Sequence, residues 1–204
     1  MDTFVKEPFN REKQFAAKRR AVIRAAGEAF RRQGYHNTSM TGIAKALGLS
    51  KAALYYYVKN KEEVLFECHR MVYDAMEDVL EMNRGSGKSG LDYLTDIFTE
   101  LVTLLTRDGL SLLTDVNSLS GDWRKQVLTQ RGVIERRITQ IVDGGINDGS
   151  IRTSDPRLTV FFFMGALNWL NVWYEGGGRQ SGADIAAHFT AQMRAGIAKA
   201  PAAP

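Results

Sequence analysis

The chain has 204 residues, of which 44% are hydrophobic and 25% charged, a mixture typical of proteins that bury a core. Its single cysteine, Cys68, excludes an internal disulfide, and the sequence predicts neither a secretory segment nor a membrane span, so we expect a cytoplasmic protein without membrane contact. Residues 1–70 hold 14 Lys/Arg against 7 Asp/Glu, whereas residues 71–204 hold 13 against 16. This asymmetry favours an N-terminal region that meets phosphate groups, although a chance excess of solvated charge would also produce it.

The first part of the sequence predicts four helices. Apolar residues recur at spacings of three and four over residues 11–33, and Gly34 supplies a helix stop. Three polar residues suited to N-caps, Ser39, Ser50 and Asn60, precede the next helical segments. These segments cover residues 40–47, 51–57 and 61–84.

Five more helices are predicted after the flexible linker 85–90, over residues 91–106, 110–119, 123–146, 156–174 and 181–197. No period-2 run is long enough to build a sheet, and no internal repeat is visible. We therefore predict an all-α fold of two domains. An N-terminal helix-turn-helix three-helix bundle covers residues 1–60, a C-terminal helical domain covers residues 61–204, and helix 61–84 connects them.

Residues 39–65, SMTGIAKALGLSKAALYYYVKNKEEVL, hold the most informative pattern. Two short helices joined by a glycine-containing turn have the dimensions of a helix-turn-helix. Tyr55, Tyr56 and Tyr57 cannot all point into a core, because neighbours on a helix are about 100° apart. Exposed phenols and the small residues Ala52 and Ala53 are suited to a helix that approaches phosphates and base edges. A small helical bundle with an aromatic surface is the alternative interpretation.

This segment resembles the DNA-binding domain of TetR-type repressors, through Ile43-Ala44, Gly48-Leu49-Ser50, Leu54-Tyr55 and Lys61-Glu62-Glu63-Val64-Leu65. Val58 stands where phenylalanine is more common in that family. The resemblance implies a repressor that binds palindromic operator double-stranded DNA as a homodimer and is released by a small hydrophobic effector. It implies no enzymatic activity and no cofactor.

The resemblance also implies the residues that meet DNA. The expected set includes the capping residues Ser39 and Ser50. Thr41 and Lys51 would read bases or touch phosphates, and Ala52 and Ala53 would lie against base edges. Tyr55 would bond a phosphate, Tyr56 and Tyr57 would contact phosphate or base, and Lys61 would anchor the DNA backbone. Lys18 and Arg19 would reach flanking phosphates or the minor groove.

The C-terminal domain contains residues 160–174, VFFFMGALNWLNVWY, which are apolar almost all round and predict burial on two sides. One side fits the core of the domain, and the other fits a second subunit, with Gly165 and Ala166 allowing close helix approach. A second apolar stripe on the last helix is expected to complete this dimer seam. Its members are Ile185, Phe189, Met193 and Ile197.

An effector pocket is expected between this seam and the helix after the linker. Its predicted lining consists of Phe98, Leu101, Val102, Leu105, Phe162, Asn168, Trp169 and Trp173, which equally describe an ordinary core. Residues 165–178, followed by 185–196, resemble a branch of the family that senses acyl-CoA thioesters, including regulators of steroid degradation. That resemblance implies a bulky hydrophobic or CoA-linked effector. Basic residues available to CoA phosphates are Arg124, Arg131, Arg136 and Arg137.

Two alternatives stay open at this stage. One is a DNA-binding regulator without a small-molecule effector, controlled by protein partners or by its own concentration. The other is an enzyme, for which the sequence shows no Ser/His/Asp or Cys/His arrangement. No metal site is predicted, because His36, His69 and His188 lie far apart in the sequence with no neighbouring ligand set.

Overall fold

The computed structural model describes residues 9–82, 87–152 and 155–197. In these ranges it contains α-helices, one 3-10 turn and no strand, so the predicted all-α class is confirmed. The elements are α1 (Phe9–Gln33), α2 (Met40–Ala46), α3 (Lys51–Tyr57), α4 (Lys61–Met82), α5 (Gly90–Thr106), η1 (Val116–Ser118), α6 (Gly121–Asn147), α7 (Pro156–Trp173) and α8 (Gly182–Ile197).

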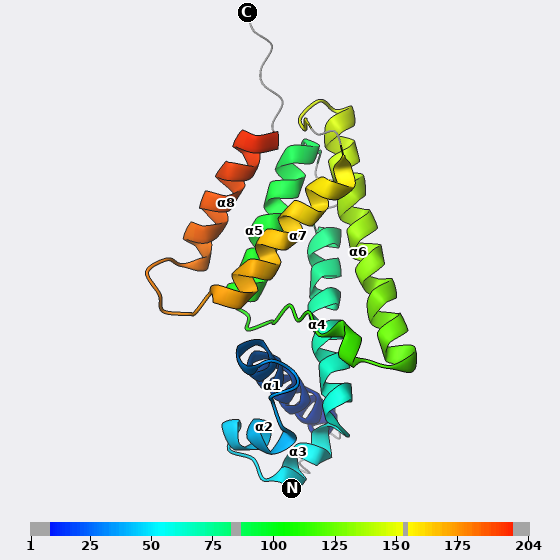
Figure 1. The fold of residues 1–204 in the computed structure, drawn as a ribbon, viewed down its shortest axis with the longest axis vertical. Coiled ribbons are helices and arrows are strands. Elements are labelled where there is room, and N and C mark those ends of the chain that lie inside the picture. The colour runs from blue at the N-terminus through cyan, green and yellow to red at the C-terminus, as the bar shows by residue number, and fades with distance from the viewer. Residues whose placement is uncertain (1–8, 83–86, 153–154, 198–204) are drawn as a thin grey trace, which may run out of the picture.

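Two groups of helices are joined by the long helix α4 (Figure 1). The helices α1, α2 and α3 pack on one another at the N-terminal end of α4. The other group consists of α5–α8, in which α5 contacts α6, α7 and α8. Helix α4 contacts α1 of the first group and α5 and α6 of the second, so it packs against both groups.

Local signals in the sequence explain where these helices begin. The Ser89 hydroxyl accepts a hydrogen bond from the Asp92 N–H at 3.2 Å at the start of α5. The Asp155 carboxylate accepts one from the Leu158 N–H at 3.0 Å, directly before Pro156 at the start of α7. Both are N-caps that satisfy amides without a partner inside the helix.

The segment between α5 and α6 is not the helix predicted over residues 110–119. After Gly109, at φ +64°, the chain runs without regular structure until η1. Four consecutive side chains, Leu110 to Leu113, are buried, which suits a segment enclosed on several sides rather than a helix with one buried face. The Leu112 N–H and C=O both pair with the Asn171 side chain, at 3.0 Å each. The helix prediction was wrong because this long-range pairing takes the place of helical hydrogen bonds.

The apolar helix α7 has two different faces. Val160, Phe163, Leu167 and Leu170 are buried in the core of the chain. On the other side Phe162 is 72% exposed and Trp169 is 65% exposed. Helix α7 is therefore apolar on two sides, as predicted. In the single chain one of these sides is buried in the core and the other is exposed to solvent.

The stripe predicted on α8 faces the chain's own core rather than outward. Ile185 and Met193 are buried, and Phe189 and Ile197 pack against the core cluster. Ile185 and Met193 are therefore taken up by packing against α5, whereas Phe189 and Ile197 border the open groove between α7 and α8, so that a part of this stripe in a dimer seam stays a prediction. An ion pair between Arg194 and Asp92, at 2.7 Å, joins the same two helices.

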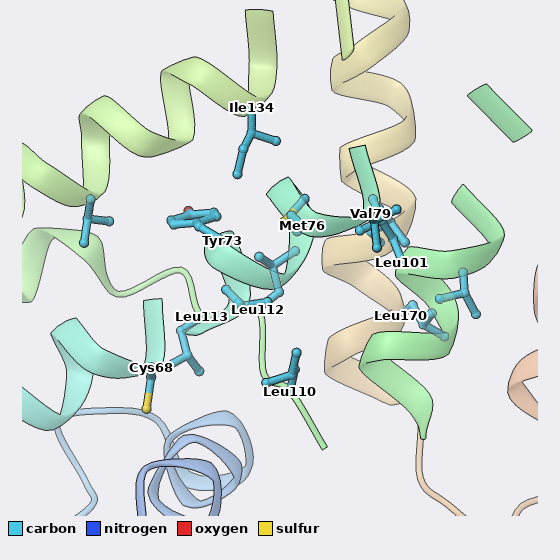
Figure 2. Packing of buried hydrophobic residues seen from close by; sticks show 14 of the residues in the cluster. Cys68, Tyr73, Met76, Val79, Leu101, Leu110, Leu112, Leu113, Ile134 and Leu170 are labelled. Atoms are coloured by element: carbon cyan, nitrogen blue, oxygen red, sulfur yellow. The ribbon is translucent and has the colours of Figure 1, made fainter. Parts of the chain in front are cut away.

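The thiol of Cys68 is buried at the contact between α4 and α1. Its sulfur points toward α1 (Figure 2) and donates to the Ile23 carbonyl at 3.3 Å. Burial raises the pKa of this thiol, and Cys68 belongs to the core together with Leu65 and Val72 of the same helix. None of the described helices is long and apolar enough to cross a membrane.

Candidate DNA-binding surface and internal cavity

The helix-turn-helix is built by two serine caps and a glycine turn. The Ser39 hydroxyl accepts from the Gly42 N–H at 3.0 Å, and the Ser50 hydroxyl accepts from the Ala53 N–H at 3.1 Å. Between the two helices Gly48 adopts φ +64°, a left-handed conformation that favours glycine. The caps thus fix where α2 and α3 start, and the turn fixes their relative direction.

A small core holds these two helices against α1. Ile43, Ala44 and Leu54 are buried, as the sequence predicts, and Val58 is 2% exposed at the end of α3. Their partners on α1 include Val22, Ile23 and Phe30. The opposite face of α3 is thereby left pointing outward.

The three consecutive tyrosines divide between surface and interior. Tyr55 and Tyr56 are 43% and 70% exposed, whereas Tyr57 is half-buried and packs against the core. Phe15 of α1 lies against Tyr56 and Tyr57, with ring centroids 5.3 Å from each. Tyr57 therefore has a packing role in the single chain in addition to the DNA contact predicted for it.

The remaining predicted residues of α2 and α3 form an exposed surface. Thr41, Lys51 and Ala52 are exposed, and Ala53 is half-buried below them. The Lys51 ammonium lies 6.0 Å from the centre of the Tyr55 ring. A cation, two phenols and small side chains consequently lie together on one short helix, and Lys18 adds an exposed charge on α1.

Arg19 does not share this exposure. Its guanidinium donates to the Tyr57 carbonyl and to the carboxylates of Glu63 and Glu67, at 3.1 Å each. These contacts tie α1 to α3 and α4. Since the guanidinium is engaged by two carboxylates, these ion pairs must open before Arg19 makes the phosphate contact predicted for it.

Lys61 begins α4 beside the Asn60 cap, whose side chain accepts from the Glu63 N–H at 2.7 Å. Its ammonium donates to the His36 carbonyl at 3.3 Å and lies 4.3 Å from the centre of the Tyr35 ring. Burial lowers the pKa of Lys61, and the charge of Asp115 partly offsets this effect. Because an ammonium has three donors, one hydrogen bond to His36 leaves it able to bind a phosphate.

A partly open cavity lies between α4, residues 112–116, α6 and α7, with a volume of about 120 Å³. Figure 2 shows Ile134 of α6 pointing toward the ring of Tyr73 of α4, above Leu112 and Leu113. The lining consists of His69, Tyr73, Leu112, Leu113, Thr114, Val116, Arg131, Ile134, Glu135, Val160, Phe161, Met164 and Asn168.

His69 is the unusual residue of this cavity. It is 1% exposed, and neither ring nitrogen has a hydrogen-bond partner among the described residues. The imidazole stacks on Tyr73, with centroids 6.1 Å apart and planes 21° apart. Burial, and next the charge of Arg131, lower the pKa of His69 from 6.5 to about 4. The imidazole is therefore neutral at physiological pH.

The eight residues predicted to line a pocket do not surround one cavity. Only Asn168 lines the cavity of His69. Leu101 and Val102 are core residues, Leu105 borders a separate cleft beside Arg31, and Phe98 with Phe162 borders an apolar groove between α7 and α8. Trp169 and Trp173 are exposed on the outer side of α7. The sequence offered one signal for the cavity, a histidine on the apolar stripe of helix 61–84.

Of the four arginines proposed for CoA phosphates, Arg131 lines the cavity. Arg137 pairs with Glu81 at 2.6 Å, and Arg124 donates to Asn117 at 3.4 Å. Arg136 is exposed on α6. In the part of the chain that the structure describes, no group of three or more His, Cys, Asp or Glu side chains could hold a metal ion.

Comparisons with known proteins agree with this architecture. Residues 22–68 match the model of bacterial regulatory proteins of the tetR family, and residues 84–197 match the model of the tetracyclin repressor-like C-terminal domain. The uncharacterized HTH-type transcriptional regulator YhgD of Bacillus subtilis is 25% identical over 155 residues, which are 72% of this chain and 78% of YhgD. The biofilm operon negative regulator IcaR of Staphylococcus aureus is 26% identical over 40% of this chain and 44% of IcaR.

Two solved structures are similar over most of their length. AibR, in complex with isovaleryl coenzyme A and operator DNA, has a TM-score of 0.72 and 26% identity, covering 85% of this chain and 96% of AibR. The TetR family regulator PfmR of Thermus thermophilus has a TM-score of 0.73 and 25% identity, covering 86% of this chain and 97% of PfmR. Because the C-terminal family model matches more than half of the chain, and the N-terminal model covers the helix-turn-helix, the chain belongs to the TetR family of bacterial transcriptional regulators.

Proposed function

We propose that two copies of this chain bind palindromic operator DNA and repress transcription, and that a small hydrophobic effector in the C-terminal domain releases the DNA. The observation that carries the DNA-binding part is the exposed face of α3, where Lys51, Tyr55 and Tyr56 stand on a helix fixed by its cap and core. This face belongs to the basic half of the chain, which favours contact with phosphates.

In this proposal α3 enters the major groove. Thr41, Lys51, Ala52 and Ala53 lie toward the bases, and Tyr55 and Tyr56 bond the flanking backbone. Lys61 holds a phosphate at the start of α4, where the helix dipole also favours an anion. Lys18 reaches the backbone from α1. Tyr57 acts mainly by packing α3 on Phe15.

The exposed side of α7 supports the homodimer. Phe162, Trp169 and Val172 are each more than half exposed, and their combined apolar surface is unusual for a monomer. A two-fold copy of α7 and of the outward face of α8 would cover it. Such symmetry matches a palindromic operator, whose half-sites repeat about every 34 Å along the DNA.

The cavity of His69 supports an effector, because apolar walls from α6, α7 and the segment 112–116 meet the polar side chains of His69, Asn168 and Arg131 there, a combination that ligand sites use. An acyl-CoA is the candidate we favour, since AibR is similar over most of its length and its structure contains isovaleryl coenzyme A. The alternative is regulation by protein partners or by concentration alone, without an effector, and it predicts that acyl compounds leave operator affinity unchanged.

Two elements are placed to couple the cavity to the DNA-binding domain. Helix α4 carries His69 and Tyr73 of the cavity and begins at Lys61. The segment after α5 lines the cavity through residues 112–116 and continues to two contacts with the first domain. Ser118 lies 3.2 Å from the His36 ring, and Ser120 donates its N–H and hydroxyl to Glu62 at 2.7 Å each.

The proposal is tested by selecting tight binders from a pool of random duplexes. We expect enrichment of a two-fold symmetric site, bound with an affinity that falls steeply with salt. Lys51→Ala should weaken binding and reduce the salt slope by about one phosphate contact. The matched control is Lys125→Ala, which replaces an exposed lysine on α6 and should leave operator binding unchanged. Failure to enrich any duplex would overturn the proposed function.

A further inference from the structure

The size of the cavity limits its occupant. At about 120 Å³ it is comparable to an apolar cavity of about 150 Å³ that accepts a benzene-sized ligand. A long acyl chain or a steroid nucleus does not fit entirely inside this volume. Of the two effectors that the C-terminal resemblance implies, bulky hydrophobic or CoA-linked, the cavity favours a CoA-linked or free acyl group whose buried part is compact.

The walls and the buried histidine define the chemistry of that occupant. Leu112, Ile134 and Val160 are buried apolar wall residues, and Met164 is half-buried among them. His69 offers a neutral imidazole with one N–H donor and one acceptor, neither used by a described residue. Buried polar groups are nearly always paired in native states, so the imidazole indicates a ligand atom or water that completes it.

Arg131 gives the mouth of the cavity a positive charge. It is exposed, it lines the cavity, and its charge is felt at His69 and Tyr73. It makes no ion pair with any described residue, whereas neighbouring Glu135 is paired with Arg157 at 2.7 Å. An anionic group beside the buried part of a ligand would therefore meet an unpaired cation.

We propose that the cavity binds a short acyl group of about four to six carbons, with its carbonyl oxygen accepting a hydrogen bond from His69 and with Arg131 at the mouth, where it pairs with the carboxylate of a free acid. This assignment rests on the proposed function, because it names the effector of that repressor. The acyl group has two possible sources, a free carboxylic acid and a coenzyme A thioester. In the acid Arg131 pairs with the carboxylate, and in the thioester, whose phosphates lie beyond the pantetheine arm, Arg131 stands where that arm leaves the cavity.

The test is calorimetric titration of the full chain with butanoate, hexanoate, butanoyl-CoA, hexanoyl-CoA and palmitoyl-CoA. We expect at least one short acyl compound to bind at least about tenfold more tightly than palmitoyl-CoA. Binding of the thioesters alone identifies them as the source, and binding of the acids identifies the acids. Absence of binding by every short compound would overturn the proposal.

Two variants test the roles of the residues. His69→Phe keeps the ring shape and should weaken short-acyl binding about tenfold or more, while its melting temperature stays equal or rises. His188→Phe, an exposed histidine on α8, is the control and should bind as the wild type does. Met164→Ala enlarges the cavity and should move the preferred chain length upward, a readout that is independent of His69.

The outcomes separate this inference from the proposed function. Unchanged short-acyl affinity in His69→Phe, or an unchanged length preference in Met164→Ala, would contradict the assignment of the cavity. Operator binding and its release by another chemical class would then leave the repressor proposal intact. If acyl ligands bind as expected but no operator is found, the repressor proposal fails and the cavity assignment stands.

Discussion

The Asn171 side chain pairs with both backbone groups of Leu112, accepting from the N–H and donating to the carbonyl at 3.0 Å each. Leu112 lines the cavity, and the Asn171 carbonyl accepts from Arg31 of α1 at 2.9 Å. One residue of α7 thus fixes a wall of the cavity and also meets the DNA-binding domain. This arrangement explains why an amide is buried in an otherwise apolar helix.

Replacing this amide should destabilise the chain. Asn171→Leu leaves the N–H and C=O of Leu112 buried without a partner, and we expect the free energy of unfolding to fall by about 2–4 kcal/mol. Urea unfolding measures this change. Asn168→Leu, one turn earlier on α7, is the matched control and should cost less than about 1 kcal/mol, since the Asn168 amide makes no hydrogen bond within the described residues. Equal losses in the two variants would contradict the role given to Asn171.

The division among the tyrosines predicts opposite effects of two neighbouring substitutions. Tyr55→Ala removes an exposed phenol and should weaken operator binding with little change in stability. Tyr57→Ala removes packing against Phe15 and the core, so the free energy of unfolding should fall by about 2 kcal/mol. Thermal unfolding and fluorescence anisotropy with labelled operator measure the two effects. Weaker DNA binding without loss of stability in Tyr57→Ala would reverse the assignment.

Stability should decline as the pH falls from about 6.5 toward 4, because of His69. Its pKa is lowered in the folded state to about 4, so in this window the unfolded chain binds a proton that the folded chain does not. The free energy of unfolding should drop by up to about 3 kcal/mol across the window. His69→Phe should flatten the dependence, particularly above pH 5, and His188→Phe should retain it. An unchanged slope in His69→Phe would show that the imidazole is not held neutral by burial.

The dimer is tested at Gly165 on the open side of α7. A Cβ added there meets no atom within 4 Å, so Gly165→Leu fits the single chain. In a close helix seam the same side chain should separate the subunits. Gly144→Leu on α6, where a Cβ is equally free, is the control. Sedimentation should give a monomer for the first variant and a dimer for the second, and a dimer in both would exclude Gly165 from the interface.

Local signals made the DNA-binding domain predictable. Ser39, Ser50 and Asn60 each cap the helix that follows, and Gly48 turns the chain between α2 and α3. The residues that set the helix boundaries therefore lie close to those boundaries in the sequence. The outward direction of Tyr55 and Tyr56 follows from helix periodicity and a buried Leu54. The ion pairs of Arg19 could not be predicted in the same way, since its partners Glu63 and Glu67 lie on another helix.

The C-terminal domain was less predictable, because long-range contacts decide it. The irregular segment around Leu112 depends on Asn171, which is 59 residues away in the sequence. Trp169 was expected in a pocket and is exposed, because an apolar side chain on α7 can face either the core or a partner subunit. His69 was considered only as a metal ligand, and its cavity forms only when four separate segments come together.

In the proposed repressor, a ligand in the cavity and DNA on α3 oppose each other's binding. The most direct test measures operator affinity with and without saturating butanoyl- or hexanoyl-CoA, and ligand affinity with and without operator. Linkage requires the two ratios to be equal, and we predict a ratio of tenfold or more, which corresponds to about 1.4 kcal/mol of coupling. If ligand and operator each bind tightly but neither changes the affinity for the other, the proposed release of DNA by the ligand is contradicted.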